Sequence, residues 1–180
     1  MIVGSELTDT PWPPGPIATE RLIVRPTCAS DRSGYIDLLA SAEVRKYLGG
    51  PRAREELEHI APEIPGSRPG VFAVEALSTF VGAVVLDRRG ADQPGHLRPD
   101  GGELEVSYTF LPAHWGRGYA TEAVTAALDW AAQSLVDRDV IVCTQVANAR
   151  SLRLARRLGF REVIRFDQFG ATQWLGARDL

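Results

Sequence analysis

The stretch that decides the fold runs from Gly102 to Ala132 and reads GELEVSYTFLPAHWGRGYATEAVTAALDWAA. In its first part, polar side chains alternate with apolar or aromatic ones, which is the two-residue period of a half-buried strand. The polar side carries Glu103, Glu105, Ser107 and Thr109, and the other side carries Leu104, Val106, Tyr108 and Phe110. We expect the strand to end at Pro112, because proline cannot donate to a β-ladder.

Two glycines, Gly116 and Gly118, separate this strand from a predicted helix. Apolar residues recur there at helical spacing, namely Ala123, Val124, Ala127, Leu128 and Ala131. A helix start leaves about four backbone N–H groups unpaired and carries a partial positive charge. Glycines let another group approach that backbone closely. The turn therefore suits a phosphate or pyrophosphate, although an ordinary strand-to-helix connection has the same pattern.

The glycine turn is neither a nucleoside-triphosphate loop nor a dinucleotide loop. No GKS or GKT sequence ends it, and the third glycine of the dinucleotide fingerprint is missing. Residues Trp115 to Ala120 instead resemble the acyl-CoA loop of the GNAT superfamily of N-acetyltransferases, written Q/R-x-x-G-x-G/A. Gly118 and Ala120 fill its last two named places, whereas Trp115 stands where Gln or Arg is usual.

Longer phrases extend this resemblance to the Rim-type branch, which acetylates the N-termini of ribosomal proteins. The phrase from Glu105 to Ala123 is similar to that branch, in which a tryptophan before the first glycine is common. Residues 19–26, TERLIVRP, resemble its opening strand, and residues Asn148 to Phe160 resemble its N-x-x-S…LGF segment. The resemblance covers most of residues 19–165. It implies an α/β (α+β) fold of GNAT type, with a mixed, mostly antiparallel, splayed central sheet flanked by helices.

Length and composition indicate one globular domain. The chain has 180 residues, of which 44% are hydrophobic and 24% charged, enough for one core. No internal repeat or linker to a second domain is present. We therefore expect a flexible, proline-rich lead-in over residues 1–18 and a single N-acetyltransferase domain over residues 19–180.

Periodicity and turn residues predict the remaining elements. Strands are expected at 19–26, 71–76, 80–87 and 139–145, with a closing hairpin at 160–167 and 172–178. Helices are expected at 32–40, capped by Asp31, at 52–60, and at 148–158, capped by Asn148 and ended by Gly159. Residues 88–101 are rich in glycine, proline and charge and read as a loop, which we expect to border the acceptor.

Bulk properties exclude several other classes. The net charge of −3 gives no electrostatic reason to expect a nucleic acid or an anionic membrane as partner. No apolar run approaches the ~20 residues of a membrane span, and no secretory signal is visible. The three histidines, His59, His96 and His114, lack metal-ligand spacing, so we expect no metal site. Cys28 and Cys143 are isolated and are expected to be reduced, in a cytoplasmic protein that is a monomer or homodimer.

Acetyl transfer to an amine needs a group that accepts the amine's proton. An N-terminal amine has a pKa of about 7.7–8.0 and a lysine about 10.4, and a carboxylate can take the proton directly or through water. Glu105 is the first candidate, because it matches the glutamate of the family's E-I-G-Y phrase. Glu103 shares its face of the strand and is the second candidate. The alternative is that both are solvated charges on a half-exposed strand.

The resemblance also implies the acetyl-CoA contacts. They fall on Phe110, Leu111, Trp115, Gly116, Arg117, Gly118, Tyr119, Ala120, Thr121, Asn148 and Ser151. Backbone groups of residues 110–112 are expected to hold the pantetheine arm and polarise the thioester. Many relatives carry a tyrosine that protonates the leaving thiolate where this chain has Ala155, so Ser151 is the remaining candidate for that sulfur. Asn148 and Ser151 could instead simply cap their helix.

We therefore predict that the chain is an acetyl-CoA-dependent N-acetyltransferase that acts by direct transfer in a ternary complex. A protein or peptide N-terminal amine is the first choice of acceptor. A small amine, such as an aminoglycoside, polyamine or amino acid, is an alternative, and a non-catalytic acyl-CoA-binding sensor is another. A nucleoside-triphosphate-binding protein is disfavoured, because no phosphate-binding Lys or magnesium-binding Ser or Thr follows Gly118 in register.

Overall fold

The computed structural model describes residue 7 and residues 12–180, in which eight strands form one sheet in the order β1-β2-β3-β4-β5-β6-β8-β7. The strands are β1 (Ile17–Ala18), β2 (Ile23–Pro26), β3 (Val71–Ala76), β4 (Thr79–Arg88), β5 (Leu104–Phe110), β6 (Asp139–Gln145), β7 (Arg161–Gln168) and β8 (Ala171–Asp179). All neighbours in the sheet are antiparallel except β5 and β6, which are parallel. The predicted mixed, mostly antiparallel sheet is therefore confirmed.

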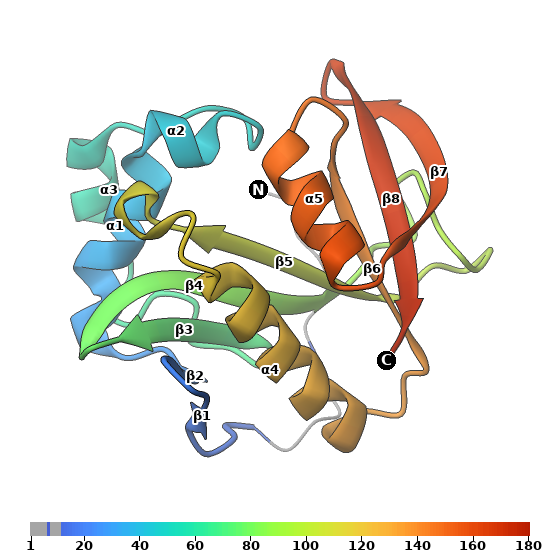
Figure 1. Ribbon diagram of the computed structural model, residues 1–180. Coiled ribbons are helices and arrows are strands. Elements are labelled where there is room, and N and C mark those ends of the chain that lie inside the picture. Colours follow the sequence, from blue (N-terminus) through green and yellow to red (C-terminus); the bar gives the residue numbers. More distant parts are fainter. Residues whose placement is uncertain (1–6, 8–11) are drawn as a thin grey trace.

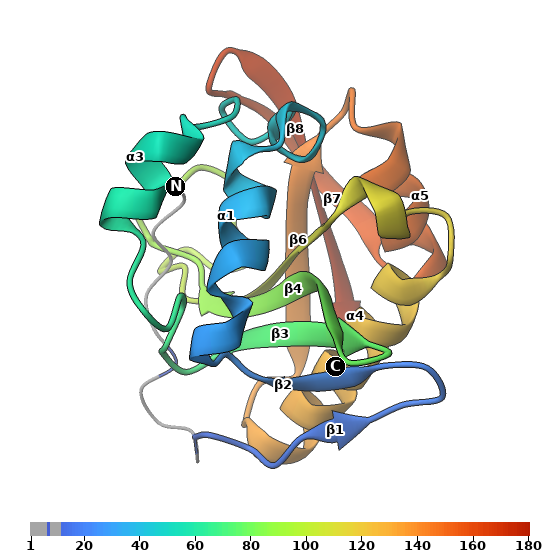
Figure 2. The same cartoon turned by 90° about the vertical axis from the view of Figure 1, so that its left-hand side faces the viewer.

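Helices cover both faces of this sheet (Figures 1 and 2). They are α1 (Arg32–Ala40), α2 (Ala42–Arg45), α3 (Arg54–Ile60), α4 (Tyr119–Ser134) and α5 (Ala149–Arg157), with 3-10 turns at Ala29–Asp31 and Pro112–His114. Helix α4 runs along one face, and α1 lies on the other. The alanine-rich stripe of α4 packs on β5 through Leu104 and Val106 in the main core, because small side chains let a helix approach a sheet closely.

Three local features differ from what the sequence predicted. The strand expected at 19–26 is interrupted, since Thr19 and Leu22 form a turn between β1 and β2 with an N–H to O=C distance of 2.9 Å. Asp31 precedes α1 but does not cap it, because its carboxylate binds Arg25 at 2.8 and 2.9 Å. The short helix α2 was not expected. Its serine cap, Ser41, accepts a hydrogen bond from the backbone of Val44 at 3.2 Å.

The predicted flexible lead-in does not extend to residue 18. Residues 1–6 and 8–11 lie outside the described residues, but Leu7 is buried. The ring of Trp12 packs edge-on against Phe72 and Trp130, at centroid distances of 5.1 and 5.9 Å. The strand β1 then joins the sheet through β2. Aromatic burial thus anchors a proline-rich segment whose composition suggested a loose chain.

None of the helices in the described part of the chain is both long and apolar enough to cross a membrane. No group of three or more His, Cys, Asp or Glu side chains in residue 7 or residues 12–180 is arranged to hold a metal ion.

Candidate functional site

A wedge opens in the sheet between β5 and β6. The two parallel strands pair only through Leu104 with Val140 and Glu105 with Ile141, at the N-terminal end of each strand. Beyond these pairs the strands diverge, and β6 continues along β8 instead (Figure 1). The predicted splay of the central sheet is present, and it begins immediately after Glu105.

Some backbone N–H groups of β5 face this wedge and are not used in the sheet. The N–H of Leu111 donates to the carbonyl oxygen of Val81 on β4 at 3.0 Å. Because backbone N–H groups alternate along a strand, those of Tyr108 and Phe110 face the opposite edge, toward β6. The carbonyl of Phe110 accepts a hydrogen bond from the indole of Trp115 at 2.7 Å. Of the predicted backbone contacts, Phe110 therefore offers its N–H to the wedge, whereas the N–H of Leu111 is used by β4.

The predicted glycine turn, here called the glycine loop, consists of residues 115–118. It lies at the mouth of the wedge and leads directly into α4. Gly116 and Gly118 have φ of 75° and 81°, a conformation that other residues rarely adopt. Gly118 is the N-cap of α4 and contributes no side-chain cap, so the first N–H groups of this 16-residue helix stay available to an anion. Tyr119, Ala120 and Thr121 form its first turn. The loop is tied to the turn between β1 and β2, because Arg21 donates to the carbonyl of Arg117 at 2.8 Å.

We expect Gly116→Ala to weaken CoA binding by about tenfold or more, which corresponds to ~1.4 kcal/mol. A Cβ at Gly116 would meet no atom within 4 Å, so it would enter the open space from which an anion approaches the loop. Gly159 is the matched control, because it has φ of 89° and an equally open surrounding. Alanine at either position should cost ~1–2 kcal/mol of stability. Calorimetry with CoA should separate the two variants, and equal CoA affinity would contradict this role of the loop.

Glu105 and Arg89 form a buried ion pair on the face of the sheet opposite α4. The Arg89 side chain is fully buried and donates to the Glu105 carboxylate at 3.0 Å, and Glu105 keeps 11% of its side chain exposed. Arg89 also donates to the carbonyl of Pro94 at 2.5 Å. Burial raises the pKa of Glu105 above its ordinary value, and the Arg89 charge limits that rise. The alternative, a solvated carboxylate, is therefore wrong for Glu105, which has a defined partner and a narrow opening to solvent.

Glu103 is fully buried, and its carboxylate binds the loop that was predicted at residues 88–101. Its carboxylate accepts hydrogen bonds from the backbone N–H groups of Leu97 and Arg98 at 2.6 and 2.8 Å, and it lies 3.0 Å from Nδ1 of His96. Burial acts to raise the pKa of Glu103, but these hydrogen bonds outweigh it and the pKa falls below its ordinary value. Glu103 is neither solvated nor directed at the wedge, so its contacts favour a structural role.

Asn148 and Ser151 lie at the start of α5, on the β6 side of the wedge. The Asn148 side chain accepts a hydrogen bond from the N–H of Ser151 at 3.2 Å, so the capping expected for Asn148 is present. The Ser151 hydroxyl lies 2.7 Å from the hydroxyl of Tyr108 on β5. Ala155, at the position where relatives carry a tyrosine, is fully buried. Tyr108 thus contacts a predicted site residue, although the alternating pattern placed it only on the apolar side of the strand.

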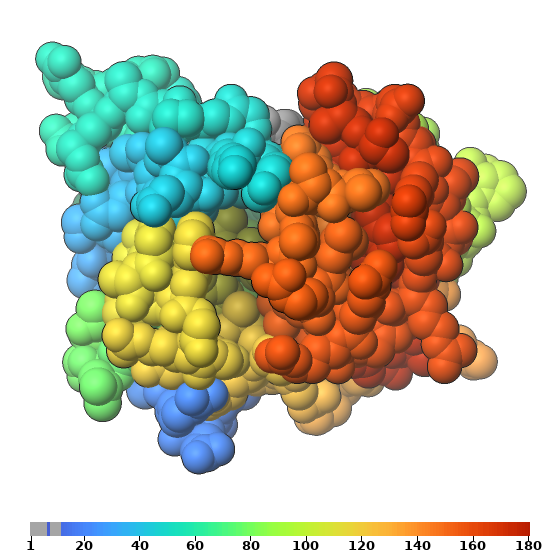
Figure 3. Space-filling model, turned by 45° about the horizontal axis from the view of Figure 1, so that its top comes forward, coloured from blue at the N-terminus to red at the C-terminus, as the bar shows by residue number. Residues whose placement is uncertain are grey.

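The opposite end of the wedge opens onto the α1 face of the sheet. Ser107 is exposed although it lies in the middle of β5. Gln145 at the end of β6 donates to the carbonyl of Tyr47, after α2, at 3.3 Å. Figure 3 shows β5 at the bottom of a hollow between the α2 region, the loop before α4 and α5. The wedge can therefore be approached from two sides of the sheet, with Glu105 deep between them.

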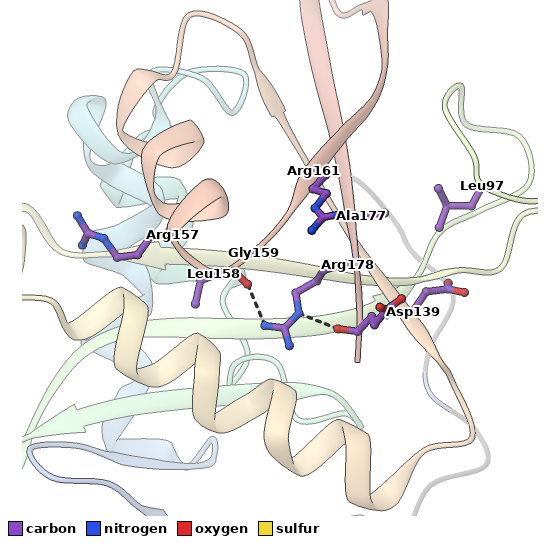
Figure 4. Close-up of a pocket in the computed structure, with 9 residues that line it drawn as sticks. Leu97, Asp139, Arg157, Leu158, Gly159, Arg161, Ala177 and Arg178 are labelled. Atoms are coloured by element: carbon purple, nitrogen blue, oxygen red, sulfur yellow. Dashed lines mark hydrogen bonds between the residues drawn. The ribbon is translucent and has the colours of Figure 1, made fainter.

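Two pockets lie near the edges of the molecule. One, of ≈ 630 Å³, lies between the end of α5, the start of β6 and the end of β8, and its lining residues include Arg157, Arg161, Arg178 and Asp139 (Figure 4). It contains none of the predicted site residues. The other, of ≈ 610 Å³, is lined by residues 18–23, by the β3–β4 turn and by Tyr119 in the first turn of α4. Neither pocket coincides with the wedge.

Comparisons with known proteins agree with this geometry. The sequence model of the acetyltransferase (GNAT) domain matches residues 21–161. The uncharacterized N-acetyltransferase YoaA of Bacillus subtilis is 24% identical over 162 residues, which cover 81% of this chain and 82% of that protein. Among solved structures, the ribosomal L7/L12 alpha-N-protein acetyltransferase in complex with coenzyme A is 16% identical, with a TM-score of 0.70, covering 92% of this chain and 98% of that one. The aminoglycoside acetyltransferase AAC(6')-Ib in complex with coenzyme A is 12% identical, with a TM-score of 0.69 and coverage of 88% and 94%.

Proposed function

The chain belongs to the acetyltransferase (GNAT) family, and on that premise we propose that it transfers an acetyl group from acetyl-CoA to a primary amine. The acceptor we propose is a protein or peptide N-terminal amine, acetylated directly in a ternary complex. The observation that carries this proposal is the wedge itself. An uncapped helix start stands at one of its openings, and the buried carboxylate of Glu105 lies between that opening and the other.

The residues around the glycine loop suit the donor. The diphosphate of CoA would lie against the backbone of Gly116 to Gly118 and the first turn of α4, where N–H groups and the helix dipole favour anions. Arg117 could add a charge-assisted hydrogen bond. The pantetheine arm would then pass along the open edge of β5, and the N–H of Phe110 could stabilise the negative charge that develops on the thioester oxygen.

Glu105 would take the proton of the amine. Arg89 holds one side of its carboxylate, and the exposed 11% of the side chain leaves a route for a proton, directly or through water. A carboxylate with a charged partner is a modest base. It therefore suits an N-terminal amine with a pKa of about 7.7–8.0 better than a lysine amine with a pKa of about 10.4. This difference supports an N-terminal amine as the acceptor.

Direct transfer is favoured over a covalent acetyl-cysteine. Cys143 on β6 is the nearest thiol to the Arg89–Glu105 pair, and burial raises its pKa to about 11, against the influence of Arg89. At neutral pH this thiol remains protonated and is a weak nucleophile. The amine would thus attack the thioester itself, with both substrates bound.

The test is thiol release from acetyl-CoA in the presence of N-terminal peptides, aminoglycosides, polyamines and amino acids. CoA binding is measured by calorimetry alongside. Turnover with peptides alone would support the proposal. Turnover only with small amines would transfer the assignment to them, and tight CoA binding without turnover would favour an acyl-CoA sensor. Absence of CoA binding would contradict the proposed site at the glycine loop.

A further inference from the structure

One arginine joins the turn between β1 and β2 to the glycine loop and the start of α4. Arg21 donates to the carbonyl oxygen of Arg117 at 2.8 Å. A Cβ added to Gly118 would lie 3.2 Å from a terminal nitrogen of the Arg21 side chain. The guanidinium also lies over the ring of Tyr119, 5.2 Å from its centroid. The loop is therefore contacted along its second half by a residue 96 positions earlier in the chain.

Glu122 in the first turn of α4 holds the Arg21 side chain in this place. Its carboxylate accepts hydrogen bonds from Nε and from the backbone N–H of Arg21, both at 2.8 Å, and it lies 2.6 Å from a terminal nitrogen of the guanidinium. The Thr19 hydroxyl donates to the same carboxylate at 2.6 Å. Burial acts to raise the pKa of Glu122, but the hydrogen bonds from Thr19 and Arg21 outweigh it and the pKa falls. Glu122 therefore carries its charge at neutral pH.

The Arg21 contact selects the orientation of the peptide between Arg117 and Gly118. In a trans peptide the C=O and the N–H point in opposite directions. With the carbonyl on Arg21, the N–H of Gly118 points away from the β1–β2 turn, and it makes no hydrogen bond within the described part of the chain. Gly116 and Gly118 flank this peptide, and glycine adopts either sign of φ. The loop's own residues therefore do not fix the orientation, and a contact from outside must do so.

We propose that Arg21 is a positioning residue, which binds the Arg117 carbonyl and so directs the Gly118 N–H at the diphosphate of CoA. This inference rests on the proposed function and deepens it. Arg21 acts through the loop and not as a phosphate ligand, because its guanidinium is already bound by Glu122 and by that carbonyl. The first residue of the loop is held separately, since the indole of Trp115 donates to the carbonyl of Phe110 at 2.7 Å.

Two variants separate positioning from simple charge attraction, with CoA affinity measured by calorimetry. Arg21→Lys keeps the positive charge, but one ammonium group cannot reproduce the fork that binds Glu122 and the Arg117 carbonyl together. We expect its Kd for CoA to be about tenfold higher than that of the wild type. Glu122→Gln removes a negative charge from the start of α4, which by charge alone would strengthen the binding of an anion. We expect weaker CoA binding instead, because Arg21 loses the charged partner that holds it.

Arg165→Lys is the matched control, because Arg165 on β7 is also about half exposed and also pairs with a glutamate, Glu162. Exposed ion pairs contribute little to stability, so Arg21→Lys and Arg165→Lys should unfold at similar temperatures, whereas only Arg21→Lys should bind CoA more weakly. In turnover, Arg21→Lys should raise the KM for acetyl-CoA about tenfold with little change in kcat.

Two results would overturn the inference: wild-type affinity for CoA in Arg21→Lys, or tighter binding of CoA in Glu122→Gln. A different result would overturn the proposed function alone. In that case the wild type binds CoA and acetylates no amine, while both Arg21→Lys and Glu122→Gln bind CoA more weakly than the wild type.

Discussion

Replacing Glu105 with glutamine is expected to lower the turnover number of acetyl transfer by about 10²–10⁴-fold and to leave the Kd of CoA unchanged. Glutamine keeps the size of the side chain but cannot accept the proton of the amine. Glu105 belongs to the last residue pair of β5 and β6, near the end of β5 that is remote from the glycine loop, so CoA contacts should be preserved. Steady-state kinetics and calorimetry on the same protein measure the two quantities. Equal turnover in both proteins would remove Glu105 as the base.

The pH dependence gives a second signature of Glu105. Because burial raises its pKa above the ordinary 4.5, activity should be lost as the pH falls through that raised value. The acidic limb of kcat/KM should therefore lie above pH 4.5 in the wild type. In Glu105→Gln this limb should be absent from the residual activity. A limb at the same pH in the variant would assign it to another group.

Glu103→Gln is the matched control, because it makes the same chemical change two residues earlier in the chain, immediately before β5. Glu103 binds the backbone of Leu97 and Arg98, so its loss should act on the loop and on stability. Hydrogen bonds to a buried charge contribute about 1.5–3 kcal/mol each. We therefore expect Glu103→Gln to have a lower free energy of unfolding than the wild type and to bind CoA with the same affinity. A loss of kcat as large as that of Glu105→Gln, in a folded protein, would favour Glu103 as the base.

Replacing Arg89 with methionine is expected to destabilise the protein by about 3–5 kcal/mol, the usual cost of breaking a buried ion pair. The Arg89 side chain is fully buried, and Glu105 would be left without its only charged partner among the described residues. The carbonyl of Pro94 would also lose a hydrogen bond. Chemical denaturation at neutral pH measures this loss. A free energy of unfolding equal to that of the wild type would show that the pair contributes nothing.

The sign of the pH effect follows from the direction of the Glu105 pKa. A carboxyl whose pKa is higher in the folded chain than in the unfolded chain favours folding below the unfolded pKa, and this contribution disappears as pH rises through the folded pKa. In Arg89→Met the arginine no longer limits the rise. The free energy of unfolding should then fall more steeply than in the wild type as pH increases from about 4.5 toward neutrality.

The double variant Arg89→Met/Glu105→Gln tests whether the two residues are energetically coupled. Without a charge on either partner, no uncompensated ion stays buried, and much of the lost stability should return. The double variant should also lose the steep pH dependence of Arg89→Met. Additive losses from the two single changes would show that Arg89 and Glu105 are not coupled.

Local patterns in the sequence were sufficient to predict most of the helices and strands. The alternation from Glu103 to Phe110 predicted β5, and the glycines and alanine stripe after it predicted the start of α4. The strand at Asp139–Gln145 and the helix at Arg32–Ala40 have the predicted bounds. These features depend on backbone preferences and on the period of apolar residues, both of which act over a few neighbouring positions.

Only the tertiary structure decided the partners of the site residues. Glu105 meets Arg89 from 16 positions away, and Tyr108 meets Ser151 from 43 positions away. Both contacts depend on the folded loop after β4 and on the divergence of β5 from β6. The alternating pattern shows which side of β5 carries the glutamates, but not whether that side is covered. The sequence by itself therefore determined the elements and the family. The packing between distant segments determined which carboxylate is buried, paired and still open to the wedge, because burial and charge pairing arise between residues that strand order brings together.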